Sequence, residues 1–171
     1  MSIFAYGKKE PNQNVKKILT AILFFIAFSS SAQDKIKINR IDSIVKSINS
    51  SHLPVQRDTL NQDQPALGLE SKTYLAATYH SEVLIKYEQH ANMKMANNGV
   101  SKQMKSTIVF YFHTDKLIKA EVEFSEKKAT EWYYENDEPL LDSSAPEIIQ
   151  EQALFVLNTS KNIAAQFKKQ Q

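Results

Sequence analysis

The chain has 171 residues and nearly balanced charge, with 21 basic and 19 acidic residues and a formal net charge of +2 at pH 7. It contains no cysteine, which excludes a disulfide framework, a thiol nucleophile and a lipid-modified cysteine. Neither a Gly-x-Ser-x-Gly motif nor a glycine-rich phosphate loop occurs. The common sequence signals of hydrolases and nucleotide-binding enzymes are therefore absent.

The N-terminal segment has the pattern of a secretory signal peptide. Lys16 and Lys17 precede an apolar run over residues 18–28, and a run of small residues ends at Ala32. An apolar helix of this length spans only about half of a ~30 Å hydrocarbon core, which disfavours a transmembrane anchor. We expect cleavage after Ala32 to leave a single domain over residues 33–171.

The expected signal peptide, residues 1–32, carries four of the 21 basic residues and one of the 19 acidic residues. The mature chain therefore has 17 basic and 18 acidic residues, a net charge of −1, which gives no reason to expect binding to nucleic acid or to anionic membranes. The segment before Val15 is longer and more polar than the charged N-terminal region of a signal peptide needs to be. We therefore expect translation to begin at Val15, read as methionine from an alternative initiation codon.

Hydrophobic periodicity predicts a helix at each end of the mature chain. Over residues 34–50 the apolar residues recur every three or four positions, as on one stripe of an amphipathic helix. From Ile149 to Phe167 they again recur on one face and predict a long C-terminal helix. Residues 51–70 contain two prolines and a glycine among polar residues, so we expect a long connecting loop there.

The stretch YHSEVLIKYE from Tyr79 returns 33 residues later as FHTDKLIKAE from Phe112. Apolar and polar residues alternate around both copies, which indicates half-buried strands, so each copy is expected to be a β-hairpin seen around its polar turn. A helix over residues 71–91 is the alternative, since apolar residues there also recur every four positions, but the second copy argues against it. A third and less regular copy begins at Thr130, and Pro139 marks its last strand as an edge.

The turns set the expected register. A two-residue turn at residues 98–99 places Met93 opposite Met104. Three-residue loops are expected in the two repeat copies, because a two-residue loop would turn Ile118 and the alternating apolar positions after it to the wrong face. These loops would span residues 81–83 and 114–116 and place Tyr79 opposite Ile85 and Phe112 opposite Ile118.

Together these elements predict an α+β domain: an antiparallel β-meander of five to six strands with an N-terminal and a C-terminal helix packed on one face. A helix followed by hairpins of the type aromatic, polar turn, Leu-Ile-Lys resembles a broad group of small exported bacterial proteins of unknown function. The resemblance covers about residues 73–141 and implies no catalytic residue. The chain departs from that group at its hairpin tips, where Asn-Gly is usual and this sequence has Ser81-Glu82, Thr114-Asp115 and Asn136-Asp137.

His80 and His113 occupy equivalent positions of the repeat and are the first candidates for a metal site. In the expected register they lie two strands apart, about 10 Å, and Leu84 between them offers no ligand. We therefore expect solvated histidines beside turns, with no metal or other cofactor. The alternating charges from Lys86 to Glu123 on the same face fit a solvated surface better than catalytic carboxylates.

Neighbouring aromatic residues mark the candidate binding surface. Because side chains alternate along a strand, one member of each adjacent pair should face away from the core. An outer aromatic patch could bind a sugar, a peptide or a partner protein, and methionines near the central hairpin tip would extend it. Packing within the sheet is the simpler interpretation of the same residues. The candidates are Tyr111, Trp132, Tyr133, Tyr134, Met93 and Met95.

These patterns favour an exported, non-enzymatic binding protein of the cell envelope, periplasmic or extracellular, whose partner is an envelope protein or a glycan. A small secreted hydrolase that uses His80 or His113 as its base is one alternative. A structural or stress-related envelope protein without a small ligand is another. The sequence does not determine the oligomeric state.

We predict that the exported form begins at Gln33. Intact-mass analysis of the protein recovered from the envelope fraction should give the mass of residues 33–171. A recovered chain that still carries Lys16 and the apolar run would contradict cleavage after Ala32. An uncleaved precursor that begins at Met1 would contradict the start at Val15.

Overall fold

The computed structural model describes residues 34–64, 68–97, 100–125, 128–142 and 144–168. The chain divides into two compact units, Met1–Lys37 and Ile38–Gln171, and every strand and the C-terminal helix belong to the second. The expected signal peptide, with its cleavage site after Ala32 and the start at Val15, lies outside the described residues. Among the residues that are described, no helix is long and apolar enough to cross a membrane.

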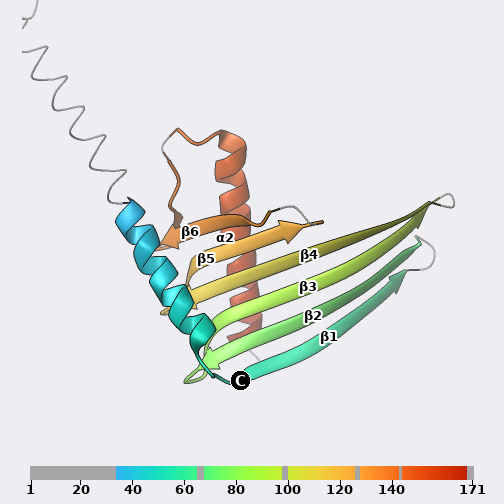
Figure 1. The fold of residues 1–171 in the computed structure, drawn as a ribbon, viewed down its shortest axis with the longest axis horizontal. Helices are drawn as coiled ribbons and strands as arrows, with labels where there is room; N and C mark the ends of the chain where they lie inside the picture. Colours follow the sequence, from blue (N-terminus) through green and yellow to red (C-terminus); the bar gives the residue numbers. More distant parts are fainter. Residues whose placement is uncertain (1–33, 65–67, 98–99, 126–127, 143, 169–171) are drawn as a thin grey trace, which may run out of the picture. The chain divides into compact units, whose positions relative to one another are not determined.

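Seven antiparallel strands form one sheet in chain order (Figure 1). Each strand pairs with the next, so the sheet is an open meander with β1 and β7 at its edges. The expected α+β class and antiparallel meander are confirmed. The strands are β1 (Val55–Gln64), β2 (Leu69–His80), β3 (Val83–Asn97), β4 (Val100–His113), β5 (Lys116–Phe124), β6 (Thr130–Glu135) and β7 (Glu138–Pro139).

β1 lies within residues 51–70, for which the sequence predicts a loop. Its ten residues pair with β2 without any shift in register. The prediction of a loop is wrong because, apart from partly buried Val55, the strand is exposed on both faces and so shows no alternation. The sheet consequently has seven strands and not the expected five or six.

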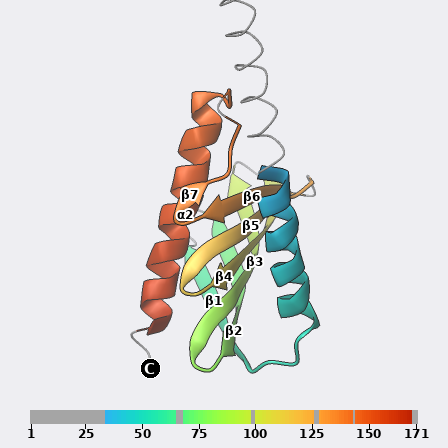
Figure 2. The same ribbon diagram turned by 90° about the vertical axis from the view of Figure 1, so that its left-hand side faces the viewer.

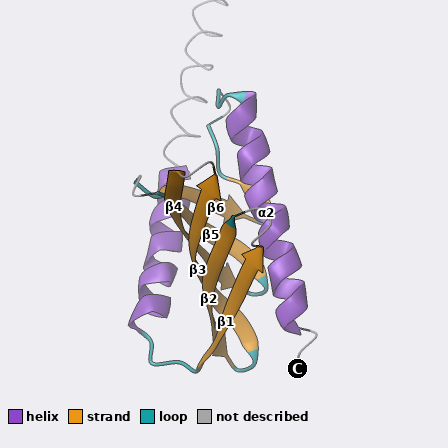
Figure 3. Cartoon of the chain, turned by 90° about the vertical axis from the view of Figure 1, so that its right-hand side faces the viewer, coloured by secondary structure: helices purple, strands orange, loops and turns teal. Residues whose placement is uncertain are grey.

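Two helices cover opposite faces of the sheet (Figures 2 and 3). The N-terminal helix, residues 34–50, places Ile41 in a buried cluster with Tyr111. The C-terminal helix α2 (Glu147–Lys168) contributes to a second cluster that contains Phe110, the neighbour of Tyr111 on β4. The prediction of one shared face is wrong, because β4 is apolar at consecutive positions and therefore needs cover on both sides.

Each copy of the repeat is a hairpin closed by a two-residue turn. Both residues of each turn, Ser81-Glu82 and Thr114-Asp115, have the positive φ angles that a type I′ turn requires. The expected three-residue loops are therefore wrong at the hairpin tip, where Phe112 faces Leu117 and not Ile118. The turns form without glycine; of their four residues, Asp115 is of a type that readily tolerates this backbone, whereas Thr114 and Glu82 are not.

A β-bulge close to each turn restores the register that the sequence predicts. In the second copy the pairing shifts between Tyr111 and Phe112, and Ile118 is the extra residue on β5. Beyond the bulge Phe110 faces Ala120, as a three-residue loop would have placed it. The first copy has the same shift 33 positions earlier. The bulge also turns Ile118 into the cluster with the N-terminal helix, whereas Ala120 belongs to the cluster with α2.

The central hairpin of β3 and β4 has the predicted register. Met93 faces Met104, whereas residues 98–99 at the turn lie outside the part of the chain that the structure describes. β3 and β4 have 15 and 14 residues, and they extend beyond the shorter β5 and β6 (Figure 1). Met93 is half-buried and Met95 is exposed on this extension.

Candidate functional site

An apolar groove lies between α2 and the part of the sheet formed by β4, β5 and β6. Its volume is about 520 Å³, within the range of roughly 300–1,000 Å³ that is typical of small-molecule sites. The side chains that line it come from these three strands and from α2 between Ile148 and Thr159. This groove is the candidate binding site.

Cross-strand neighbours build the floor of the groove. Ile108 of β4 faces Val122 of β5 in one row, and both side chains line the groove. In the next row Phe110 and Trp132 lie on either side of Ala120, which is fully buried. Both large rings line the groove, so the floor is apolar from β4 to β6.

α2 carries two apolar stripes, and the second one forms the wall of the groove. The first stripe includes Ala153 and Leu157, which are buried against the sheet; the Tyr134 hydroxyl donates to the Ala153 carbonyl oxygen at 2.9 Å and fixes the helix there. Ile148 and Phe155 form the second stripe, with exposed fractions of 58% and 72%. They are separated by about two helical turns, so both project on the same side. Large apolar residues beside the core stripe were the sequence signal for this wall.

The groove has a polar rim but no catalytic arrangement among its described residues. Glu151 is the one charged residue that lines it, beside the neutral Gln152 and Thr159. Glu151 is also the one titratable side chain in the described lining, so no acid and base pair is formed there. An apolar concavity with few polar groups is instead typical of a site that binds a ligand.

The expected outer aromatic patch is wrong, because helices cover both faces of the sheet where these residues lie. Trp132 and Tyr134 are buried beneath α2. Tyr111 is 3% exposed beneath the N-terminal helix, where its hydroxyl accepts from Asn49 Nδ2 at 3.2 Å. Tyr133 is half-buried on the same face. Of the aromatic residues proposed from the sequence, Trp132 is the one that lines the groove.

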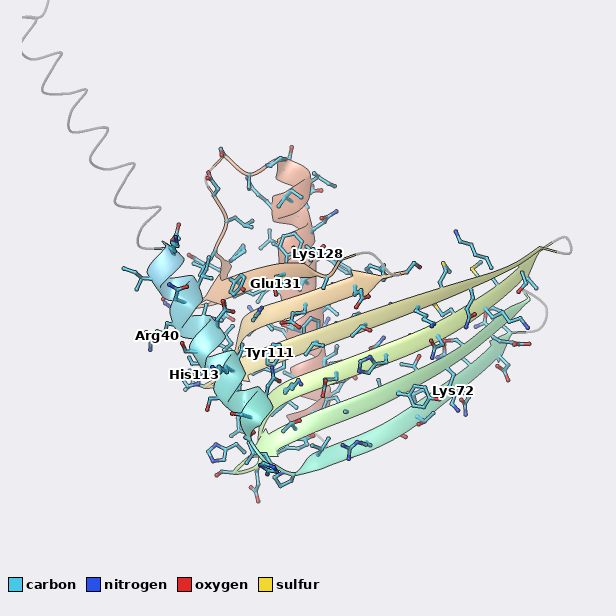
Figure 4. The ribbon with its side chains drawn as sticks, viewed as in Figure 1. Arg40, Lys72, Tyr111, His113, Lys128 and Glu131 are labelled. Carbon is cyan, nitrogen blue, oxygen red and sulfur yellow. The ribbon has the colours of Figure 1, made fainter. Side chains whose placement is uncertain are left out.

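Apart from the groove, a polar cluster lies between the sheet and the N-terminal helix, on the face that carries Tyr111 and Glu131 (Figure 4). Lys119 is only 6% exposed, and its Nζ lies 3.1 Å from both Glu121 Oε1 and Glu131 Oε1 and 3.3 Å from Asp42 Oδ1. The Tyr133 hydroxyl lies 3.0 Å from the same Asp42 oxygen. Asp42 thus connects the helix to β5 and β6. Lys119 on this polar face is therefore buried and not solvated as expected, whereas its three carboxylate partners remain partly exposed.

The charge states of this cluster are set by its hydrogen bonds. Burial by itself would lower the pKa of Lys119, but hydrogen bonds to Glu131, Tyr133 and Glu121 raise it well above the ordinary value. Burial raises the pKa of Tyr133 to about 12, although nearby Lys119 acts in the opposite direction. The raised pKa keeps the lysine charged at neutral pH, which is unfavourable for a base or a nucleophile. The cluster holds the helix on the sheet.

His80 and His113 are both exposed beside the turns of the repeat. Neither lines the groove. Throughout the described ranges, no group of three or more His, Cys, Asp or Glu side chains is placed to hold a metal ion.

Comparison of the chain with protein-family models, curated proteins and solved structures found no match. The α2 groove and the Lys119 cluster are therefore the basis on which function can be inferred.

Replacement of Lys119 with methionine should lower the free energy of unfolding by about 2 kcal/mol, because three carboxylates lose the cation between them. Those carboxylates have exposed fractions from 29% to 49%, so water compensates for part of the loss. Lys86→Met is the matched control: Lys86 occupies the equivalent position of the first repeat copy and pairs with Glu88 at 3.1 Å. Its replacement should cost less than about 1 kcal/mol. Urea denaturation measures both values, and equal losses would contradict the anchoring role of Lys119.

Stability should fall as the pH rises from 10.0, the ordinary pKa of tyrosine, to about 12, the pKa of Tyr133 in the folded chain. A raised pKa means that the folded state holds the proton more tightly, so the contribution is complete below the unfolded pKa and is lost as the pH passes the folded one. Tyr133→Phe should weaken this dependence, whereas Tyr74→Phe, at an exposed tyrosine, should preserve it. Denaturation across this pH range tests the prediction. Identical pH profiles for wild type and Tyr133→Phe would refute it.

Proposed function

We propose that the protein is an exported, non-enzymatic binding protein of the cell envelope that holds an acyl chain in the α2 groove. The pattern of residues 1–32 supports export. The groove supports binding, because its floor and wall are apolar and its volume of about 520 Å³ suits a small ligand.

The exposed wall residues of the groove are the observation that carries this proposal. Phe155 and Ile148 project from α2 beside the exposed Phe124 of β5, and all three line one concavity. Contiguous exposed apolar surface of this kind is typical of a binding site. A ligand that covers it gains about 25 cal/mol for each Å² of apolar surface removed from water.

The chemistry of the lining favours an acyl chain over a peptide or a glycan. An extended peptide brings backbone N–H and C=O groups that need partners when they are buried. The groove floor consists of side chains on the face of paired strands, so the backbone groups of β4 and β5 are already used in the sheet. A hydrocarbon chain needs no such partners. Glu151 at the rim favours a neutral or cationic head group over an anionic one.

The alternative of a secreted hydrolase has less support. Its expected bases, His80 and His113, do not line the groove. Glu151 is the one titratable side chain in the described lining, and no histidine, lysine or second acid lies beside it there to activate a threonine hydroxyl.

Trp132 allows a direct test, because it lines the groove and is the single tryptophan in the sequence. Dodecyltrimethylammonium, added below its micelle concentration, should change the tryptophan emission with a saturable dependence. Dodecanoate, which has a similar chain and an anionic head, should bind more weakly. Phe155→Asp should reduce the affinity for the cationic probe at least tenfold, because it places a charge in the apolar wall.

Leu154→Asp is the matched control, since Leu154 is the neighbouring helix residue, is 47% exposed and does not line the groove. The affinity of Leu154→Asp for the cationic probe should remain within about twofold of wild type, because Leu154 does not contact a ligand in the groove. Circular dichroism must show that both variants are folded. An unchanged emission in wild type, or equal losses in both variants, would refute the acyl-chain site. Binding of an apolar peptide without binding of the amphiphiles would identify a protein ligand instead.

A further inference from the structure

β1 forms an unusually regular free edge of the sheet (Figure 1). It has ten residues, no bulge in its pairing with β2, and neither proline nor lysine. Among the described strands it pairs with β2 alone. The opposite edge, β7, has two residues, one of which is Pro139. Natural edge strands are commonly protected by proline, charged side chains, bulges or short length. Of these features β1 has charged side chains alone, at Arg57, Asp58 and Asp63.

The backbone groups that face outward from β1 can be identified. The Tyr79 amide donates to the Pro54 carbonyl oxygen at 3.1 Å, so Pro54 and Tyr79 are a hydrogen-bonded pair. Hydrogen-bonded and non-hydrogen-bonded pairs alternate along an antiparallel ladder. The N–H and C=O groups of odd-numbered β1 residues therefore point away from β2. The Thr59 amide agrees with this assignment, because it donates to the side chain of Asp58, at 2.7 Å.

These outward groups restrict how a second copy of β1 can pair with the first. Around a two-fold axis, odd-numbered residues must face odd-numbered residues, because only they present outward hydrogen-bonding groups. When Leu60 lies on the axis, this condition is met and Arg57 faces Asp63 of the second copy, once on each side. Shifting the register by two residues in either direction loses this ion pair. The strand is therefore complementary to itself in one register.

We propose that two copies of the chain associate through their β1 strands, antiparallel, with Leu60 on the two-fold axis. The exposed Leu60 side chains meet at a non-hydrogen-bonded pair, where facing side chains lie closest. Two Arg57–Asp63 ion pairs flank this contact. Asp58 releases the Thr59 amide, which then donates to the Asn61 carbonyl of the second copy. The two sheets become continuous across the axis, and this pairing does not depend on what the α2 groove binds.

A charge swap tests both the association and its register. Wild-type exported protein should sediment as a dimer in the micromolar range at low ionic strength, where charge pairs are least screened. Arg57→Asp alone, or Asp63→Arg alone, places like charges opposite each other twice and should weaken dimerisation at least tenfold. An equimolar mixture of the two variants should form a heterodimer, because every facing pair again has opposite charges.

Thr59→Pro provides an independent variant, because it removes an outward N–H group without removing a bond to β2. It should be monomeric with an unfolding transition close to that of wild type. A wild-type protein that stays monomeric throughout the micromolar range would overturn the proposal. So would single charge variants that dimerise as tightly as wild type, or a mixture of the two that remains monomeric. If Thr59→Pro does not fold, the charge swap alone decides the outcome.

Discussion

The fold depends on one constraint: the central strands are apolar at consecutive positions, and side chains alternate across a strand. Val109 and Tyr111 therefore point to one face, and Phe110 and Phe112 point to the other. Neither face can remain in water without exposing large apolar surface, so each must be covered. A helix at each end of the sequence provides this cover, which explains why a simple meander requires both helices.

The repeat shows how one short sequence can serve different roles in the same sheet. Both copies form the same two-residue turn and the same bulge, since these features depend on local sequence. Their lysines nevertheless differ, because Lys119 lies under the N-terminal helix with three carboxylates and Lys86 has the single carboxylate partner Glu88 among the ion pairs described. The similar local sequence thus gives both copies the same turn and bulge. Packing of the N-terminal helix on the second copy gives Lys119 its role in holding that helix.

Both proposed interaction surfaces lie where the cover of the sheet ends. α2 buries its first apolar stripe, and its second stripe leaves the groove open beside Phe155. β1 lies at the edge, and its outward backbone groups have no neighbouring strand among those described. An apolar groove selects a ligand by shape and lack of polar groups, whereas a strand edge selects a partner by register. The two surfaces therefore suit different kinds of partner.

Local sequence by itself determined the α+β class and the two helices through hydrophobic periodicity. The internal repeat identified the hairpins, and the turn at residues 98–99 set the facing of Met93 and Met104. The tertiary structure decided which helix covers which face of the sheet. The alternation of side chains along a strand separates two faces, but it does not determine which element packs on each. It also revealed β1, whose exposed side chains carry no periodic signal. The groove formed only when Trp132 and Phe155, on separate elements, were brought together by the packing of α2 on the sheet.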